Sequence, residues 1–233
     1  MAAKIEEARE LRKQTAEEAA TLWTTSLRSE FDRCRCDEVP LERLCASIID
    51  NLHSNPRYAD TGVPCVRSPD VGWGTLNLDT ALKTDEVEYR RRTVRGEPQA
   101  DDIVLVREGG GTGKAALVLP NQRFSLGQRV MMLRPDKRCV LPKFFLYQLL
   151  SPLIQEDQIG RLSKGSASPH LNIGALRKFP FKLPPLQEQR HIVAELDDLR
   201  AQVDSLKRQQ VETSVELDAL MPSILDKAFR GEL

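Results

Sequence analysis

The sequence predicts an α+β protein, a mixed α/β globule flanked by long N- and C-terminal helices that pair as an antiparallel coiled coil. Nearly all Gly and Pro residues fall in the middle of the 233-residue chain, where short apolar runs alternate with turn signals. Both ends contain mostly helix formers, with apolar residues at helical spacing. We therefore expect a helical arm over 1–32, a globular domain over 33–182 and a long helix over 183–233.

The N-terminal helix is expected from Ala3 to about Phe31, because this segment contains neither Gly nor Pro. One stripe of residues at a spacing of three and four comprises Ile5, Ala8, Arg12, Thr15, Ala19, Leu22 and Ser26. A second stripe beside it comprises Leu11, Trp23, Leu27 and Phe31. A single helix of this length leaves its apolar stripe in water, so the pattern predicts a partner helix.

The C-terminal helix is expected to begin after the segment 183–186, which contains two prolines. Apolar residues then follow the alternating four and three spacing of a coiled coil. The predicted dimer or partner seam comprises Ile192, Leu196, Leu199, Val203, Leu206, Leu217 and Leu220. Polar Gln210 and Thr213 interrupt this seam, which costs stability and favours one register or partner. We expect Pro222 to kink or restart the helix and Gly231 to end it.

The middle of the chain shows the pattern of a mixed α/β globule with irregular loops. Short apolar runs bounded by turn residues predict strands within 62–67, 102–106, 115–119 and 129–133. Short helices are expected over 144–150, after Pro142, and over 172–178.

The overall charge is zero, with 34 Lys and Arg against 34 Asp and Glu, which by itself argues against a polybasic nucleic-acid binder. The charges are nevertheless unevenly distributed. Residues 33–182 contain 23 basic and 17 acidic residues, an excess of six positive charges. The two flanking segments together contain 11 basic and 17 acidic residues, an excess of six negative charges. A basic globule favours DNA, whereas acidic helices favour protein partners.

Several classes of protein are excluded by simple patterns. No apolar run is long enough to span a bilayer and the N-terminus lacks a signal-peptide core, so we expect a cytoplasmic protein. Five cysteines form no disulfide framework, and the Cys34-x-Cys36 pair has no second ligand pair, so we expect free thiols and no metal. The sequence contains no catalytic motif and no cofactor-binding motif, which predicts a chain that is not an enzyme by itself.

A glycine-rich stretch at 109–113, followed by Lys114, superficially resembles a phosphate-binding loop. Glu108 stands where a Walker A loop needs glycine, and Ala115 stands where it needs Ser or Thr, so NTP binding is not expected. The stretch is interpreted as a turn between strands, whose backbone N–H groups and Lys114 can still contact a nucleic-acid phosphate.

Two further segments have residues that can contact DNA. The basic cluster Arg90–Arg92 with Arg95 is either a solvated loop or a phosphate contact. The polar segment 164–172 is either a surface connection capped by Asn172 or a loop that follows a DNA backbone.

The chain resembles the specificity subunits of type I restriction–modification systems. The most specific similarity is the stretch 179–193, Phe-Pro-Phe-Lys-Leu-Pro-Pro-Leu-Gln-Glu-Gln-Arg-His-Ile-Val, followed by the C-terminal stretch 227–233. Weaker similarities lie, in the family's order, at 102–105 with 111–114, at 124–130 and at 165–172. The chain resembles half of a subunit, either a natural one-domain version or a part of a longer two-domain chain, because one globular segment is present where the family usually has two.

The resemblance implies that residues 33–182 form a target recognition domain, which reads one half of a bipartite sequence in double-stranded DNA. The resemblance also implies that the helices act as a spacer and dock methyltransferase subunits. The full complex can also contain restriction subunits. Catalysis belongs to these other subunits. With one globule and two helical arms, we expect a homodimer. The candidate DNA-binding residues are Arg57, Tyr58, Arg67, Arg91, Lys114, Arg129, Lys164, Ser166 and His170. The alternative hypothesis is a protein–protein adaptor built on a coiled coil, without DNA binding.

Overall fold

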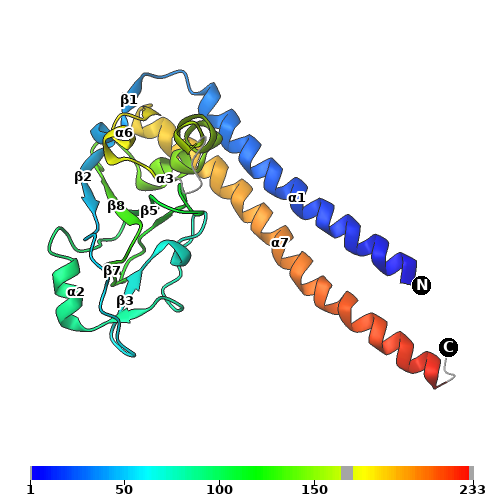
Figure 1. Cartoon of the computed structure of the whole chain (residues 1–233). Helices are drawn as coiled ribbons and strands as arrows, with labels where there is room; N and C mark the ends of the chain where they lie inside the picture. The colour runs from blue at the N-terminus through cyan, green and yellow to red at the C-terminus, as the bar shows by residue number, and fades with distance from the viewer. Residues whose placement is uncertain (1, 164–169, 231–233) are drawn as a thin grey trace. The chain divides into compact units, whose positions relative to one another are not determined.

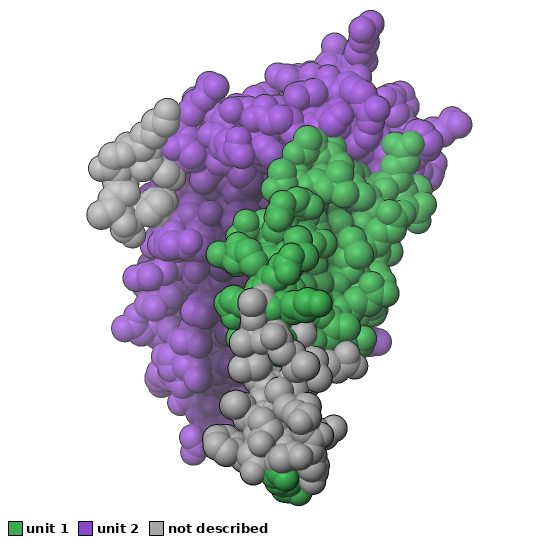
Figure 2. Space-filling model, turned by 90° about the vertical axis from the view of Figure 1, so that its right-hand side faces the viewer, with its two compact units in different colours: residues 1–26, 194–233 green, residues 27–193 purple. Residues whose placement is uncertain are grey.

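The computed structural model describes residues 2–163 and 170–230, with the backbone alone at 2–3, 163 and 214–229. The chain forms two compact units, coloured separately in Figure 2. A helical unit contains residues 1–26 and 194–233, and a globular unit contains residues 27–193. Among the described residues, no helix is sufficiently long and apolar to cross a membrane.

The helical unit is formed by parts of the two longest helices, α1 (Ala2–Arg33) and α7 (Leu186–Phe229). Figure 1 shows them side by side and antiparallel. The guanidinium carbon of Arg200 on α7 lies 5.2 Å from the centre of the Trp23 ring on α1, which places the two helices in contact. The predicted architecture, an α+β globule with long helices at both ends, is confirmed.

The buried stripe of α1 differs in part from the predicted one. Ile5, Ala19 and Trp23 are buried, whereas Leu11 and Leu22 are about half exposed and Thr15 is exposed. The least exposed positions of the first 23 residues are Ile5, Ala8, Arg12, Ala16, Ala19 and Trp23. Their mean spacing equals the 3.6-residue period of a straight α-helix, which is longer than the mean spacing of the predicted stripe. The less exposed side of the helix therefore includes Ala16 and Trp23 in place of the predicted Thr15 and Leu22.

On α7 the N-terminal part of the predicted seam is buried. Ile192, Leu196 and Val203 are buried, Leu199 is half-buried and Leu206 is 42 % exposed. The side chains of Leu217 and Leu220 lie outside the described residues.

The helix α7 continues without interruption through Pro222, so the predicted restart at this residue is wrong. Gly231, predicted to end the helix, lies outside the described residues.

The globular unit is built on a four-stranded antiparallel sheet with the strand order β2-β8-β5-β6. Its strands are β2 (Cys45–Asp50), β8 (Val130–Pro135), β5 (Ile103–Val106) and β6 (Ala115–Leu117). Ile103 pairs with Leu133 on one side and with Leu117 on the other, so β5 lies inside the sheet and is buried along its whole length. The strands predicted from the apolar runs at 102–106, 115–119 and 129–133 are present.

Two smaller sheets complete the unit. In the first, β3 (Val63–Val66) pairs antiparallel with β4 (Lys83–Thr84) and parallel with β7 (Ser125–Leu126). In the second, β1 (Glu38–Pro40) pairs antiparallel with β9 (Pro180–Lys182). The strand predicted within 62–67 is therefore present as β3, whereas the very short strands have no detectable period in the sequence.

Helices cover the sheets. The predicted short helices are present as α3 (Pro142–Leu150) and α6 (Ile173–Leu176), and the side chain of Asn172 accepts hydrogen bonds from two backbone N–H groups at the start of α6. The shorter helices are η1 (Leu41–Leu44), η2 (Ser68–Asp70), α4 (Pro152–Ile154), η3 (Gln155–Gly160) and α5 (Arg161–Ser163). Phe144 of α3 is fully buried and packs edge-on against Phe31, with ring centres 5.4 Å apart.

The basic cluster at residues 90–92 is not a solvated loop. It forms the last turn of α2 (Glu86–Arg92), a helix capped by the side chain of Asp85. Seven residues are too few for a helical period to be detected, although Asp followed by an acidic first turn and a basic last turn is a helix signal.

Candidate DNA interface

The glycine-rich stretch forms the turn between β5 and β6, as predicted. Gly109 and Gly113 have φ angles of 88° and 94°, a conformation that L residues other than glycine rarely adopt. A hydrogen bond from the Gly113 N–H to the Val106 carbonyl, 2.9 Å long, closes the turn. Gly110 is exposed, and apart from its two chain neighbours no residue has an atom within 4 Å of the position that a Cβ would occupy, so the tip of the turn is open.

Two cations lie at this turn. Lys114 follows it directly and is half-buried, and Arg129 precedes β8 and is exposed. The guanidinium of Arg129 lies 3.5 Å from the position of a Cβ at Gly109, so it reaches the start of the turn. Neither side chain forms an ion pair with any residue in the described part of the chain. Unpaired cations beside an accessible backbone are suited to phosphate contacts.

A buried arginine, Arg107, lies at the base of the same turn with 6 % of its surface exposed. Its Nη1 donates to Asp50 Oδ1 over 2.7 Å, and its Nη2 lies 3.3 Å from Nε2 of His170. Its Nε makes a 3.4 Å ion-pair contact with Glu108, whose carboxylate also lies 3.1 Å from Nδ1 of His170. His53 contacts the other oxygen of Asp50 over 3.2 Å. His170, predicted to contact DNA from a polar loop, therefore contacts Arg107 and Glu108 at the glycine turn.

A second ionic cluster surrounds the buried carboxylate of Glu88 on α2. Arg91 donates to both of its oxygens over 2.6 and 2.9 Å, and Arg92, itself fully buried, donates over 2.9 Å. Arg57 approaches the same carboxylate to 3.4 Å. Hydrogen bonds from Arg91 are the main reason why the pKa of Glu88 falls to about 2. Arg91 also donates to the Ser54 hydroxyl, so the cluster fixes the loop before β3.

Tyr58 and Arg67 form a third group. The guanidinium carbon of Arg67 lies 5.7 Å from the centre of the Tyr58 ring, and its Nε lies 3.6 Å from the buried carboxylate of Asp70. Burial raises the pKa of the Tyr58 hydroxyl, so this group stays protonated at neutral pH.

The structure thus distributes the predicted DNA-binding residues over three groups. Lys114, Arg129 and His170 gather around Arg107, Arg57 and Arg91 gather at Glu88, and Tyr58 contacts Arg67. Lys164 and Ser166 lie outside the described residues. The segment from Asp50 to Ser54 contacts both the Arg107 and the Glu88 clusters, and so connects the first two groups.

Local sequence patterns do not indicate Asp50, Glu88 or Arg107, and they indicate Arg92 only as a member of the basic cluster. Arg107 could have been identified as a candidate site residue, because it is the first charged residue after four buried strand residues. Its main partner, Asp50, is 57 positions away, and no local pattern joins them.

The cysteines are free thiols in the structure. All five cysteines are free, and burial raises the pKa of Cys34 and of Cys45 to about 12, so both thiols stay protonated. Within residues 2–163 and 170–230, no group of three or more His, Cys, Asp or Glu side chains is placed to hold a metal ion.

Residues 96–216 match the family model described as the type I restriction modification DNA specificity domain, and the chain belongs to this family. It is similar to the specificity subunit of the type I restriction enzyme EcoBI of Escherichia coli, with 29 % identity over 175 residues, covering 74 % of this chain and 36 % of the relative. The EcoKI specificity subunit of E. coli K12 is 25 % identical over 199 residues, covering 82 % of this chain and 42 % of the relative.

Solved structures show the same fold. The HsdS subunit from Thermoanaerobacter tengcongensis matches with a TM-score of 0.61 and 28 % identity, over 99 % of this chain and 56 % of the other. A chain from a structural study of assembly and conformational transition of the type I R-M system matches with a TM-score of 0.75 and 27 % identity, over the same shares. The chain thus spans about a third to just over half of the length of these relatives.

Proposed function

We propose that the chain is a DNA-recognition subunit of a type I restriction–modification complex, and that its domain over 33–182 reads one half of a bipartite target. The main support is the pair of unpaired cations, Lys114 and Arg129, beside an accessible glycine turn in a member of this family. Phosphate contacts by these side chains would orient the domain on the duplex, while neighbouring loop residues contact base edges. The chain performs no catalysis itself, and it acts in the cytoplasm together with methyltransferase and restriction subunits.

The test is duplex binding by the full chain, measured by fluorescence anisotropy between 50 and 200 mM salt, a range chosen because phosphate contacts respond strongly to it. We expect affinity to fall steeply with salt. The double variant Lys114→Ala, Arg129→Ala should bind more weakly to every sequence, and its log–log salt slope should be smaller by about 2. The control is Arg138→Ala, because this exposed arginine already pairs with Asp136 over 2.7 Å.

A wild-type chain that binds no duplex in this assay would contradict the proposal and favour the adaptor hypothesis. An unchanged salt slope in the double variant would contradict the assignment of Lys114 and Arg129.

We further propose that two copies associate through the helices and so present two recognition domains. The support is that α7 exposes 42 % of Leu206, a residue of its coiled-coil pattern. Light scattering at micromolar concentration, with and without DNA, should give a dimer, and Leu199→Asp with Leu206→Asp should give a monomer with a folded globular unit. A monomeric wild-type chain under both conditions would contradict dimerisation.

A further inference from the structure

Arg107 is a buried cation at the base of the glycine turn. With 6 % of its surface exposed, it is poorly placed to contact DNA directly. Its guanidinium is instead directed to three side chains of the protein: Asp50 on β2, Glu108 in the turn and His170 in the segment before α6. Burial of a guanidinium is costly unless it is paired, and the two carboxylates supply that pairing.

The backbone of Arg107 joins the same segments. Its N–H donates to the carbonyl of Arg129 over 2.9 Å, and its carbonyl accepts from the N–H of Leu171 over 2.7 Å. An isolated antiparallel bridge pairs Glu108 with His170. One residue therefore holds the turn that leads to Lys114, the residue Arg129 and the segment of His170 at fixed distances.

The contacts of His170 favour one tautomer of its ring. An arginine N–H can only donate, so Nε2 of His170 accepts from Arg107, and Nδ1 carries the proton that faces Glu108. In this arrangement a neighbour on each side holds the ring in place. Arg107 also offsets one of the two negative charges of Asp50 and Glu108, which would otherwise repel phosphates near Lys114 and Arg129 more strongly.

Resting on the proposed function, we infer that Arg107 is a positioning residue for DNA binding. It holds three DNA-facing segments in their binding arrangement before DNA arrives and masks two carboxylates beneath them. Loss of this residue should weaken binding because the segments must then be ordered during association. A lysine has one compact charge and cannot donate to Asp50 and His170 in the same fork geometry, so Arg107→Lys should restore binding only in part.

The test compares Arg107→Met with Arg134→Met in the full chain. Arg134 makes an equivalent two-pronged ion pair with the buried Asp102, at 2.9 and 2.8 Å, in the same sheet, and contacts none of the three segments. At a temperature where both variants remain folded by circular dichroism, Arg107→Met should bind duplex about tenfold more weakly, and Arg134→Met about as well as wild type. Equal affinities of the two variants would overturn the inference.

The ring nitrogens of His170 provide a second readout, which a general loss of stability would not change. In ¹⁵N NMR spectra, wild type and Arg134→Met should show the single tautomer protonated at Nδ1, and Arg107→Met should show averaged tautomers. If Arg107→Met does not fold, Arg107→Lys keeps the positive charge and should still bind more weakly than wild type, because it loses the fork geometry. Wild-type affinity of Arg107→Lys and a fixed tautomer in Arg107→Met would each overturn the inference. Failure of wild type to bind any duplex would instead contradict the proposed function.

Discussion

The globular and helical units place their charged residues differently. In the globular unit the carboxylate of Glu88 is 1 % exposed and the guanidinium of Arg92 is fully buried, and both are held by several partners. In the helical unit two of the described ion pairs, Arg9 with Glu6 and Arg200 with Asp204, are local, three and four positions apart, and neither is fully buried. The globular unit thus uses buried charge to fix its loops, whereas the helical unit relies on one narrow apolar stripe. This difference is consistent with a recognition domain and a spacer.

The largest expected effect comes from removal of the buried charge of Glu88. Glu88→Gln keeps the shape but leaves Arg91 and Arg92 without their carboxylate, so we expect a loss of about 3 to 5 kcal/mol in the free energy of unfolding. The measurement is urea unfolding of the full chain, followed by circular dichroism. Glu86→Gln on the same helix is the matched control, because this carboxylate is 48 % exposed and pairs with an exposed arginine. Equal shifts for the two variants would contradict the difference between buried and exposed charge.

The same comparison predicts a dependence on pH. The pKa of Glu88 is about 2 in the folded chain and near 4.5 without its partners, so the unfolded state takes up the proton first. The stability that Glu88 contributes is therefore fully present above about pH 4.5 and decreases as the pH falls toward 2. In Glu88→Gln this part of the acid sensitivity should be absent, whereas Glu86→Gln should retain it.

The helical unit was easier to predict from the sequence than the ionic clusters. A helical stripe is a local pattern, so Ile192, Leu196 and Val203 were identified as seam residues from their spacing alone, and all three are buried. Thr15 and Leu22 were predicted to lie on the apolar stripe of α1 but are exposed. The prediction used a mean spacing shorter than the 3.6 residues per turn of the helix.

The candidate site depends instead on contacts between distant positions. Glu88 and Arg92 lie on a helix too short for a period to be detected. Arg107 meets Asp50 only when β2, β8 and β5 pair in register. The sequence therefore indicated cations of the candidate interface such as Arg129, but not the buried Arg107 and Glu88 that contact the surrounding segments.

A smaller effect is expected from the apolar stripe of the helical unit. Val203 is 1 % exposed and Val211, on the same helix, is 66 % exposed. Val203→Ala removes two buried methyl groups and should cost about 2 kcal/mol. Val211→Ala should have no cost, because alanine has the higher helix propensity and no packing is lost. Since the change in propensity is the same at both positions, the difference between the variants measures packing alone.

The readout for these variants is the fluorescence of Trp23, which is buried in the helical unit. The chain has two tryptophans, and the second, Trp73, is 49 % exposed in the globular unit, so Trp73→Phe leaves Trp23 as the single reporter. Urea midpoints that agree for Val203→Ala and Val211→Ala would show that the stripe is not the main source of stability in this unit.

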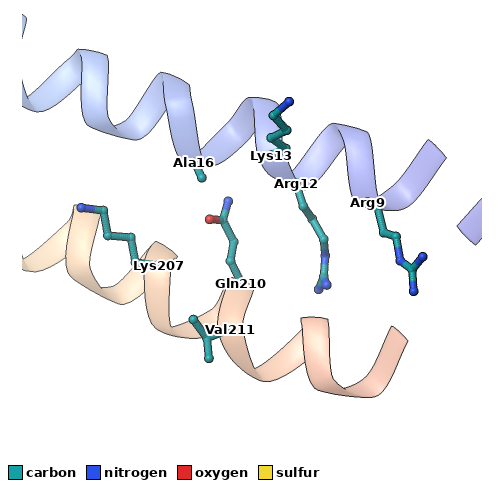
Figure 3. A pocket seen from close by; sticks show the side chains of 7 residues that line it. All are labelled: Arg9, Arg12, Lys13, Ala16, Lys207, Gln210 and Val211. Atoms are coloured by element: carbon teal, nitrogen blue, oxygen red, sulfur yellow. The ribbon is translucent and has the colours of Figure 1, made fainter. Parts of the chain in front are cut away.

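The smallest effect concerns a polar layer in the helical unit, formed by Arg12 and Gln210. Figure 3 shows Arg12 of α1 and Gln210 of α7 in the groove between the helices. Nη1 of Arg12 is buried and has no hydrogen-bond partner among the residues that the structure describes, and Gln210 interrupts the apolar pattern of α7. A buried donor without a partner costs free energy, so Arg12→Leu with Gln210→Leu should stabilise the unit by about 1 kcal/mol.

The control for this double variant is Lys13→Leu, a neighbouring exposed position that should leave the urea midpoint of Trp23 fluorescence unchanged. A polar layer in a coiled coil restricts its register and partners at the expense of stability. The stabilised variant should therefore also form larger assemblies by light scattering, because its apolar seam continues without interruption. A double variant that is less stable than wild type would show that Arg12 and Gln210 stabilise the pairing of α1 with α7, and that the helical unit depends on polar contacts as the globular unit does.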